Sequence, residues 1–320
     1  MLNKLSEENV LSAIFGIAVG DALGVPVEFE SREDLSLNPV QGMRSGGTYG
    51  QPAGTWSDDS SLTFCTMEAL LSGNDYTEIM KQFVSWIDEC HWTAHHEVFD
   101  MGIATRKALV RYSQGESPLQ CGGMGIYDNG NGSLMRIMPA ALWAFQMLGP
   151  DYNQMPEAYQ VIHDISSLTH AHPISLIACG IYCSIAGELL NKRCNPVQTG
   201  IVKAKAFYRD HREFAEYLEN FERVDLDTLM QLERKDIDSS GYVVSTLEAA
   251  LWCLCHTESY SSCLLTAVNL GEDTDTVAAV AGGLAGIQYG IQAIPSEWLE
   301  YLARAEDIRD LCHQFSMRRG

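Results

Sequence analysis

Two short acidic patches hold the residue types with the clearest capacity for chemistry. Ser57-Asp58-Asp59-Ser60 follows a glycine-rich loop, and Asp273-Thr274-Asp275-Thr276 precedes an apolar helical pattern. Ser, Thr and Asp are common helix N-caps, and acidic residues suit the first helical turn, but a cap needs one such residue and each patch offers four. Carboxylate and hydroxyl oxygens grouped in this way bind hard divalent cations. If the two patches meet in the fold, they could hold two Mg²⁺ or Mn²⁺ ions.

Two glycine-containing segments have both an ordinary and a functional interpretation. Residues 20–24, Gly-Asp-Ala-Leu-Gly, with Glu28 just beyond them, predict on their own only a helix end and a turn. Residues 128–133, Asp-Asn-Gly-Asn-Gly-Ser, predict a tight turn and a helix cap. The same residues also suit a group of backbone N–H donors at a helix N-terminus, a geometry that receives a phosphate. The spacing alone does not choose between these two.

The histidines give weaker signals. His170 and His172 precede an apolar run, where a histidine is more often a structural hydrogen-bonding group than a catalyst. His91 and His95 are four residues apart, as zinc ligands on one helix would be, but the chain contains no HExxH motif. We therefore expect no zinc site there.

The elements that must position these residues are helices. Helical spacing of apolar residues follows the first acidic patch, and strand-like alternation is nearly absent, so the sequence predicts an all-α fold. Further helical patterns cover residues 79–90, 101–112, 134–147, 174–190, 243–255, 262–270 and 277–291.

Two apolar stretches could be mistaken for targeting or membrane segments. Residues 10–20 are mostly apolar, but acidic residues precede them where a signal peptide carries positive charge. Residues 276–296 lack charge, yet they contain four Gly, two Gln and a Pro. We expect two buried core helices, and the Gly282, Gly286, Gly290 spacing suits close approach of a second backbone.

Composition narrows the partners. The 320 residues include 42 Asp and Glu against 21 Lys and Arg, a net charge of −21, with 46% hydrophobic residues. The apolar content excludes a disordered chain. The negative charge argues against nucleic acid and against an anionic membrane surface as partners. Ten cysteines without a CxxC pair favour free thiols and a cytoplasmic location.

One segment differs from the rest of the chain. Residues 192–240 hold 19 charged residues, nine basic and ten acidic. We interpret this excursion as solvated helices on the outside of a single domain spanning residues 1–320; the alternative is a lid or a recognition surface.

Taken together, several segments resemble the ADP-ribosylglycohydrolase family, in particular its bacterial branch of dinitrogenase-reductase-activating glycohydrolases. They occur in the family's order and span about residues 11–291. The matching segments are residues 16–24 with Glu28, 54–59, 100–102, 129–136, 168–170, 240–250 and 271–276.

The resemblance implies an orthogonal bundle of helices with a two-metal site. The family's metal ligands fall on Ser57, Asp58, Asp59, Asp273, Asp275 and Thr276. The main chain of Asn131, Gly132, Ser133 and Met135 would hold ribose and diphosphate, His170 would reach the ribose, and Tyr242 would stack on substrate. Ser57 replaces the more common Thr, and thereby loses a methyl group that stiffens the rotamer.

The activity implied by the resemblance is hydrolysis of the bond between ribose C1″ of ADP-ribose and a protein side chain. Asp59 would act with the metal pair, and either Glu28 or Asp128 would handle the proton. The acidic chain favours a basic target surface and therefore arginine as the acceptor. The alternatives are a non-catalytic ADP-ribose binder, a toxin-immunity protein, and a hydrolase of a small free ADP-ribose derivative.

Overall fold

A computed structural model describes residues 5–318, and these residues form α-helices, short 3-10 helices and no β-strand. The all-α prediction is therefore confirmed. The α-helices are α1 Glu7–Gly24, α2 Arg32–Leu37, α3 Asp58–Leu70, α4 Tyr76–Glu89, α5 Ile103–Ser113, α6 Met138–Leu148, α7 Pro156–Ser167, α8 Pro173–Leu190, α9 Pro196–Arg209, α10 Arg212–Ala215, α11 Leu226–Leu229, α12 Val243–Cys255, α13 Tyr260–Val268, α14 Thr274–Tyr289, α15 Ser296–Tyr301 and α16 Ala305–Met317. The 3-10 helices are Val25–Val27, Pro118–Gln120, Asn131–Ser133, Tyr152–Gln154, Glu216–Phe221, Arg234–Asp236 and Ile291–Ala293.

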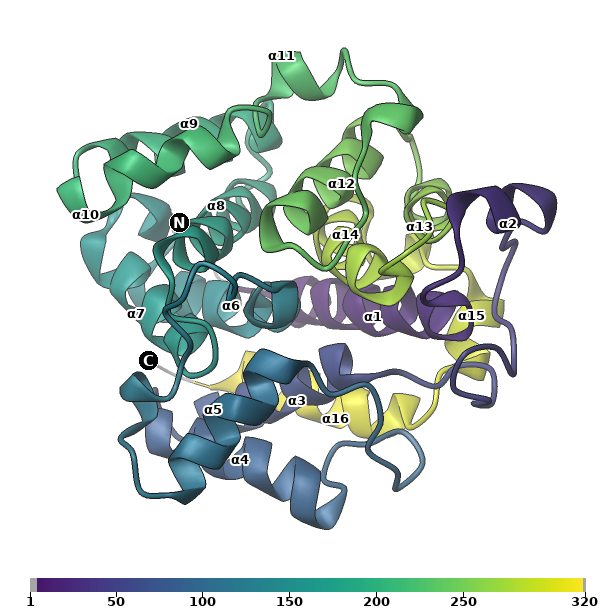
Figure 1. Ribbon diagram of the computed structural model, residues 1–320, viewed down its shortest axis with the longest axis horizontal. Helices are drawn as coiled ribbons and strands as arrows, with labels where there is room; N and C mark the ends of the chain where they lie inside the picture. Colours follow the sequence, from purple (N-terminus) through teal and green to yellow (C-terminus); the bar gives the residue numbers. More distant parts are fainter. Residues whose placement is uncertain (1–4, 319–320) are drawn as a thin grey trace.

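Helices α1 and α14 lie against each other at the centre of the molecule, and the other helices surround them (Figure 1). Gly16, Gly20 and Gly24 recur every four residues and so share one face of α1. A Cβ atom at Gly20 would lie 2.2 Å from the carbonyl oxygen of Ala278, and one at Gly24 would lie 2.3 Å from the Cα of Asp275. Only glycine permits such an approach of two backbones.

The close approach predicted from Gly282, Gly286 and Gly290 is confirmed at the first two of these glycines. A Cβ atom at Gly282 would lie 2.2 Å from the carbonyl oxygen of Gly16, and one at Gly286 would lie 1.9 Å from that of Ser12. Gly290 is different, because nothing lies within 4 Å of its added Cβ. Its φ of +83° ends the helix instead.

Two helical stretches, Glu7–Val27 and Pro173–Leu190, are long and apolar enough to cross a membrane by length and composition alone. Of the windows that meet this test, 94% and 89% of the residues are buried inside the fold. Both stretches therefore serve here as core helices, as predicted for residues 10–20. The first is buried on nearly all sides, which explains why its sequence shows no polar face.

The predicted helix over residues 134–147 begins later, at Met138. The chain enters it through the 3-10 helix Asn131–Ser133, and Pro139 occupies the first turn, where its missing N–H costs no hydrogen bond. This short approach matters for function, because it leaves residues 128–135 as a loop beside the two acidic patches.

The charged excursion over residues 192–240 forms α9, α10, α11 and two 3-10 helices. Several of its basic side chains bind groups of the core. Lys203 Nζ lies 2.7 Å from a carboxylate oxygen of Glu188 on α8, and Arg223 reaches Glu248 on α12 at the same distance. Lys205 instead donates to the carbonyl oxygen of Phe221, within the excursion itself. The two ion pairs therefore attach the excursion to α8 and α12.

Candidate active site

A cavity of about 430 Å³ opens where the N-terminal ends of α3 and α14 meet the loops before α5 and α6. One wall is acidic and comes from α3, α14 and the segment after α1. The facing wall comes from the loop over residues 127–135 and from His170, three residues before α8. The lining residues are Glu28, Asp58, Asp100, Gly102, Ile103, Ala104, Thr105, Lys107, Tyr127, Asp128, Gly130, Asn131, Gly132, Met135, His170, Asp273 and Thr276.

Asp21 shapes the acidic wall from behind. It lies on α1 and is fully buried. Its carboxylate accepts hydrogen bonds from the backbone N–H groups of Ser57 (2.9 Å) and Ser60 (3.0 Å), and from the Ser60 hydroxyl (2.6 Å). These are groups at the N-terminus of α3 that a helix leaves without internal partners. Asp21 thus caps α3 from another helix and fixes the turn that carries Asp58 and Asp59.

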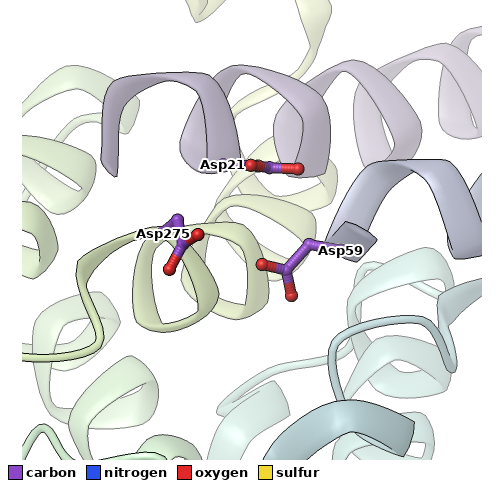
Figure 2. Close-up of side chains that lie close together, drawn as sticks. All are labelled: Asp21, Asp59 and Asp275. Carbon is purple, nitrogen blue, oxygen red and sulfur yellow. The ribbon is translucent and has the colours of Figure 1, made fainter. Parts of the chain in front are cut away.

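Asp21, Asp59 and Asp275 form a first carboxylate cluster, with one oxygen from each lying within 4.8 Å of the others. Figure 2 shows the three side chains converging from α1, α3 and α14. Asp59 Oδ2 accepts from the hydroxyls of Ser57 (3.2 Å) and Thr276 (3.3 Å). The other oxygen of Asp59, Oδ1, is buried without a hydrogen-bond donor, and so is Oδ2 of Asp275.

Glu28, Asp273 and Asp275 form a second cluster within the same 4.8 Å limit, so Asp275 belongs to both. Asp273 Oδ2 accepts a hydrogen bond of 2.9 Å from the side-chain amide of Asn131, which links the two walls of the cavity. Glu28 Oε2 is buried without a donor. Asp58 lines the cavity but belongs to neither cluster.

The electrostatics of the acidic wall are unfavourable in the protein alone. Burial raises the pKa of Glu28 to about 9, and the nearby charges of Asp100 and Asp273 push in the same direction. Burial likewise raises the pKa of Asp21 to about 6. Burial and neighbouring carboxylates raise the pKa values of Asp59 and Asp275. So many carboxylates cannot all be ionised here unless positive charge joins them.

Divalent cations fit this need. Three buried carboxylate oxygens lack donors, one in each of Glu28, Asp59 and Asp275. Buried polar atoms in folded proteins nearly always have partners, so such a set calls for a ligand. All the donor atoms are carboxylate or hydroxyl oxygens, which Mg²⁺ and Mn²⁺ prefer. Of the predicted ligands, the structure brings Asp59, Asp273 and Asp275 into the clusters.

The two predicted hydroxyl ligands flank the first cluster. The hydroxyls of Ser57 and Thr276 both contact Asp59 Oδ2 and lie beside the first cluster. Both side chains are nearly buried. The replacement of Thr by Ser at position 57 therefore keeps the hydroxyl where the hydrogen bond needs it.

Sequence reasoning gave no role to Asp100 or Tyr49, and missed Asp21 as a cap. Asp100 lines the cavity near Glu28 and has a left-handed φ of 53°. The Tyr49 hydroxyl donates to Asp100 Oδ1 at 2.8 Å. The Asp100-Met101-Gly102 segment is among those that resemble the family, so the sequence offered a signal for Asp100. Tyr49 lies in a loop, and no local pattern indicates that this loop approaches residue 100.

The facing wall is held by backbone hydrogen bonds on both sides. Gly130 pairs with Tyr242 and Gly123 pairs with His170 in isolated bridges. Fewer backbone N–H groups are free to bind substrate than the resemblance implies. The N–H of Asn131 donates to the carbonyl oxygen of Gly241, and that of Met135 donates to the carbonyl oxygen of Asn131, both at 3.1 Å. Those two N–H groups are thus engaged inside the protein.

The residues of this wall also differ in whether they contact the protein interior or the cavity. Ser133 is fully buried, and its hydroxyl accepts from Ser166 at 2.9 Å, away from the cavity. Gly132 lines the cavity and faces the His170 ring, whose Cε1 would lie 2.9 Å from an added Cβ. Tyr242 is 38% exposed at the start of α12, as a stacking residue would be.

Asp128 and His91 are both engaged in local contacts. The Asp128 carboxylate accepts from the backbone N–H of Gly125 at 3.0 Å, at the edge of the cavity. His91 Nε2 lies 2.6 Å from a carboxylate oxygen of Glu68, and His95 is exposed. No cluster suited to a metal includes either histidine within residues 5–318.

The fold and the cavity together define a class: an all-α protein whose helix ends place buried carboxylates opposite a glycine-rich polar loop. A sequence model described as ADP-ribosylglycohydrolase matches residues 3–320. The chain therefore belongs to the ADP-ribosylglycohydrolase family, and the resemblance drawn from its motifs is confirmed.

Named relatives share most of the chain. The ADP-ribosylarginine hydrolase Tri1 of Pseudomonas putida (strain GB-1) is 30% identical over 94% of this chain and 76% of its own. The ADP-ribosyl-[dinitrogen reductase] glycohydrolase of Rhodospirillum rubrum is 29% identical over 92% of this chain and 90% of its own. A solved structure, described as an ADP-ribosylglycohydrolase-related protein complex, superposes with a TM-score of 0.79 at 30% identity and covers 98% of this chain and 99% of that one.

Proposed function

We propose that this protein hydrolyses the bond between ribose C1″ of ADP-ribose and an arginine side chain of a modified protein, and so reverses mono-ADP-ribosylation. Family membership supports the reaction class. The printed name of the Pseudomonas relative supports arginine as the acceptor. The observation that carries the proposal is Asp275, which joins two carboxylate clusters at the edge of a cavity large enough for a nucleotide fragment.

Two divalent cations, Mg²⁺ or Mn²⁺, would be held by these clusters. Asp21, Asp59 and Asp275 offer one set of oxygens, and Glu28, Asp273 and Asp275 offer the other. Bound there, the cations would supply charge to fix the ribose hydroxyls and to lower the pKa of a water molecule. The donor-free oxygens of Glu28, Asp59 and Asp275 support this assignment.

Between the two candidates for the proton, the geometry favours Glu28 over Asp128. Glu28 is 4% exposed, lines the cavity, and carries one oxygen without a donor. In the protein without cations, burial raises the pKa of Glu28 to about 9, whereas a bound cation would require its ionised form. Asp128 has a carboxylate oxygen committed to the N–H of Gly125. Asp100, held by Tyr49, is close enough to Glu28 to influence its charge.

The facing wall would bind the ADP-ribose group. Gly132 and His170 line the cavity beside each other and would contact the ribose. Asn131 holds Asp273 in place through its side-chain amide, so it would tie ribose binding to the acidic wall. Tyr242 would stack on an exposed part of the substrate. Ten unpaired cysteines support the proposed cytoplasmic setting.

The test is release of ADP-ribose from an arginine-ADP-ribosylated protein with added Mg²⁺ or Mn²⁺, and again with EDTA. We expect metal-dependent release, and its loss in Asp59→Ala with the fold retained. A parallel assay on a serine-linked substrate tests the acceptor, since cleavage of serine alone would contradict arginine. If no modified protein is cleaved, calorimetry with ADP-ribose separates a binder from an inactive site.

A further inference from the structure

Arg136 is a buried cation that has no carboxylate partner among residues 5–318. It follows the cavity loop directly and is fully buried. Its guanidinium lies 4.8 Å from the centre of the Phe83 ring, and two of its nitrogens, Nε and Nη1, have no hydrogen-bond partner. Burying a charge is costly unless the group is paired and hydrogen-bonded, so the few contacts that Arg136 makes carry weight.

The remaining nitrogen of Arg136 starts a hydrogen-bond chain that ends at the cavity. Arg136 Nη2 donates to the hydroxyl oxygen of Thr169 at 2.7 Å and to the carbonyl oxygen of Ile165 at 3.2 Å. The Thr169 hydroxyl in turn lies 2.8 Å from Nδ1 of His170. Thr169 and His170 are 0% and 2% exposed, so solvent does not compete for these contacts.

The direction of this chain follows from the chemistry of its first member. A guanidinium can only donate, so the Thr169 oxygen is an acceptor toward Arg136. The hydroxyl proton of Thr169 must then go elsewhere, and Nδ1 of His170 is the other polar atom within hydrogen-bond distance among the described residues. If the hydroxyl donates, Nδ1 is the acceptor and carries no proton. The neutral imidazole then has its proton on Nε2.

The other edge of the His170 ring faces the cavity loop. An added Cβ at Gly132 would lie 3.4 Å from Nε2, and one at Gly130 would lie 3.7 Å from it. Both glycines and His170 line the cavity. Burial and the charge of Arg136 lower the pKa of His170 to about 3, so the ring is neutral at neutral pH. An Nε2 proton would therefore be the donor that the ring presents to a ligand.

We propose that Arg136 and Thr169 are positioning residues that fix His170 as the Nε2–H tautomer, so that it donates a hydrogen bond to an oxygen of the ADP-ribose group. The part of this inference that concerns ADP-ribose rests on the proposed function. The part that concerns the tautomer rests only on the contacts of the three side chains.

The test compares Thr169→Val, which removes the hydroxyl and keeps the branched shape, with Thr169→Ser, which keeps the hydroxyl. Nitrogen NMR of ¹⁵N-histidine-labelled protein reports the tautomer, with His170 assigned by the signals lost in His170→Gln. We expect the Nε2–H form in the wild type and in Thr169→Ser, and a mixture or the Nδ1–H form in Thr169→Val. Calorimetry with ADP-ribose and Mg²⁺ should show a Kd about 3- to 10-fold higher for Thr169→Val and little change for Thr169→Ser.

The outcomes are separable. An Nδ1–H tautomer in the wild type overturns the inference without any variant, so a Thr169→Val protein that does not fold leaves the test intact. An unchanged tautomer in a folded Thr169→Val protein also overturns it, as does equal affinity in the two Thr169 variants. If the wild type shows the Nε2–H form but binds no ADP-ribose, the proposed function fails and the tautomer assignment stands.

Discussion

The two walls of the cavity differ in whether their buried polar atoms have hydrogen-bond partners within the protein. The acidic wall leaves oxygens of Glu28, Asp59 and Asp275 without donors. On the facing wall, the His170 ring and the backbone of Asn131 have partners inside the protein. The acidic wall therefore has acceptors that the proposed cations would fill, whereas these groups of the facing wall are already held by protein contacts.

The difference concerns how each wall is stabilised. Close packing of α1 on α14 forces Asp21 and Asp275 together despite their charges, so packing energy opposes electrostatic repulsion there. The facing wall needs no such force, because bridges at Gly123 and Gly130 hold its loop. We therefore expect substitutions in the acidic wall to change activity and cation binding most. Removal of one of its carboxylates should also stabilise the cation-free protein.

The largest expected effect is that of Asp275→Asn, because Asp275 belongs to both clusters. We expect hydrolysis to fall by more than about 100-fold, because loss of a direct ligand should exceed the loss seen when a residue that only supports a ligand is removed. We also expect the cation-free variant to melt at a higher temperature than the cation-free wild type, since one buried charge is gone. Activity assays and thermal melts with EDTA check the two effects.

The matched control is Asp307→Asn, which removes a carboxylate that pairs with Arg304 outside the cavity. It should leave activity and cation binding unchanged. A lower melting temperature for cation-free Asp275→Asn would contradict the idea that this wall is strained by like charges.

The next effect tests the packing that holds the acidic wall together. In Gly20→Ala, the new Cβ would meet the carbonyl oxygen of Ala278 at 2.2 Å and push α1 from α14. We expect a loss of about 1–3 kcal/mol in the free energy of unfolding, as for other overpacked sites, together with weaker cation binding. Urea titration and calorimetry with Mg²⁺ measure the two quantities.

Gly42→Ala is the control for that substitution, because the nearest atom to its added Cβ is 3.4 Å away. If Gly20→Ala loses stability but binds Mg²⁺ like the wild type, then the contact of α1 with α14 supports the fold without setting the carboxylate geometry.

A smaller effect follows from the pKa of Glu28, which burial raises from 4.5 to about 9. A raised folded-state pKa favours the folded protein at low pH, and this contribution is lost as pH rises through about 9. Without cations, the melting temperature should therefore fall between about pH 6 and pH 8. Cations need the ionised form, so Mg²⁺ should raise the melting temperature more at pH 8. Equal increments at both pH values would show that protons and cations do not compete here.

How far the sequence predicts the molecule depends on how local each signal is. The sequence shows the acidic patches at Asp58-Asp59 and at Asp273 to Thr276, because each patch is continuous and starts a helix. The all-α fold class can also be predicted, since helical spacing of apolar residues repeats along the chain. These features depend on neighbours within one or two helical turns.

Other features depend on contacts between distant segments. Asp21 sits in an apolar helix, and the N–H groups that it binds are 36 and 39 residues away. The hydroxyl of Tyr49 reaches Asp100 across 51 residues. No local pattern encodes such contacts. The sequence also could not show that the N–H groups of Asn131 and Met135 donate within the protein, because the turn conformation decides which donors remain free.

The smallest effect concerns Tyr49, whose hydroxyl donates to Asp100 at 2.8 Å on the acidic wall. This hydrogen bond lowers the pKa of Asp100, against the larger effect of burial, which raises it. In Tyr49→Phe the pKa of Asp100 should therefore rise, so that Asp100 is protonated up to a higher pH. The loss of one hydrogen bond to a carboxylate should lower kcat/KM by about 3- to 10-fold, and the low-pH limb of the pH profile should move to higher pH. Tyr127→Phe is the control, because that side chain is 99% exposed at the cavity rim and has no such partner within the described residues. A uniform drop in rate without movement of the profile would assign Tyr49 to packing of the loop, and would leave the charge of Asp100 under the control of Glu28 and the cations alone.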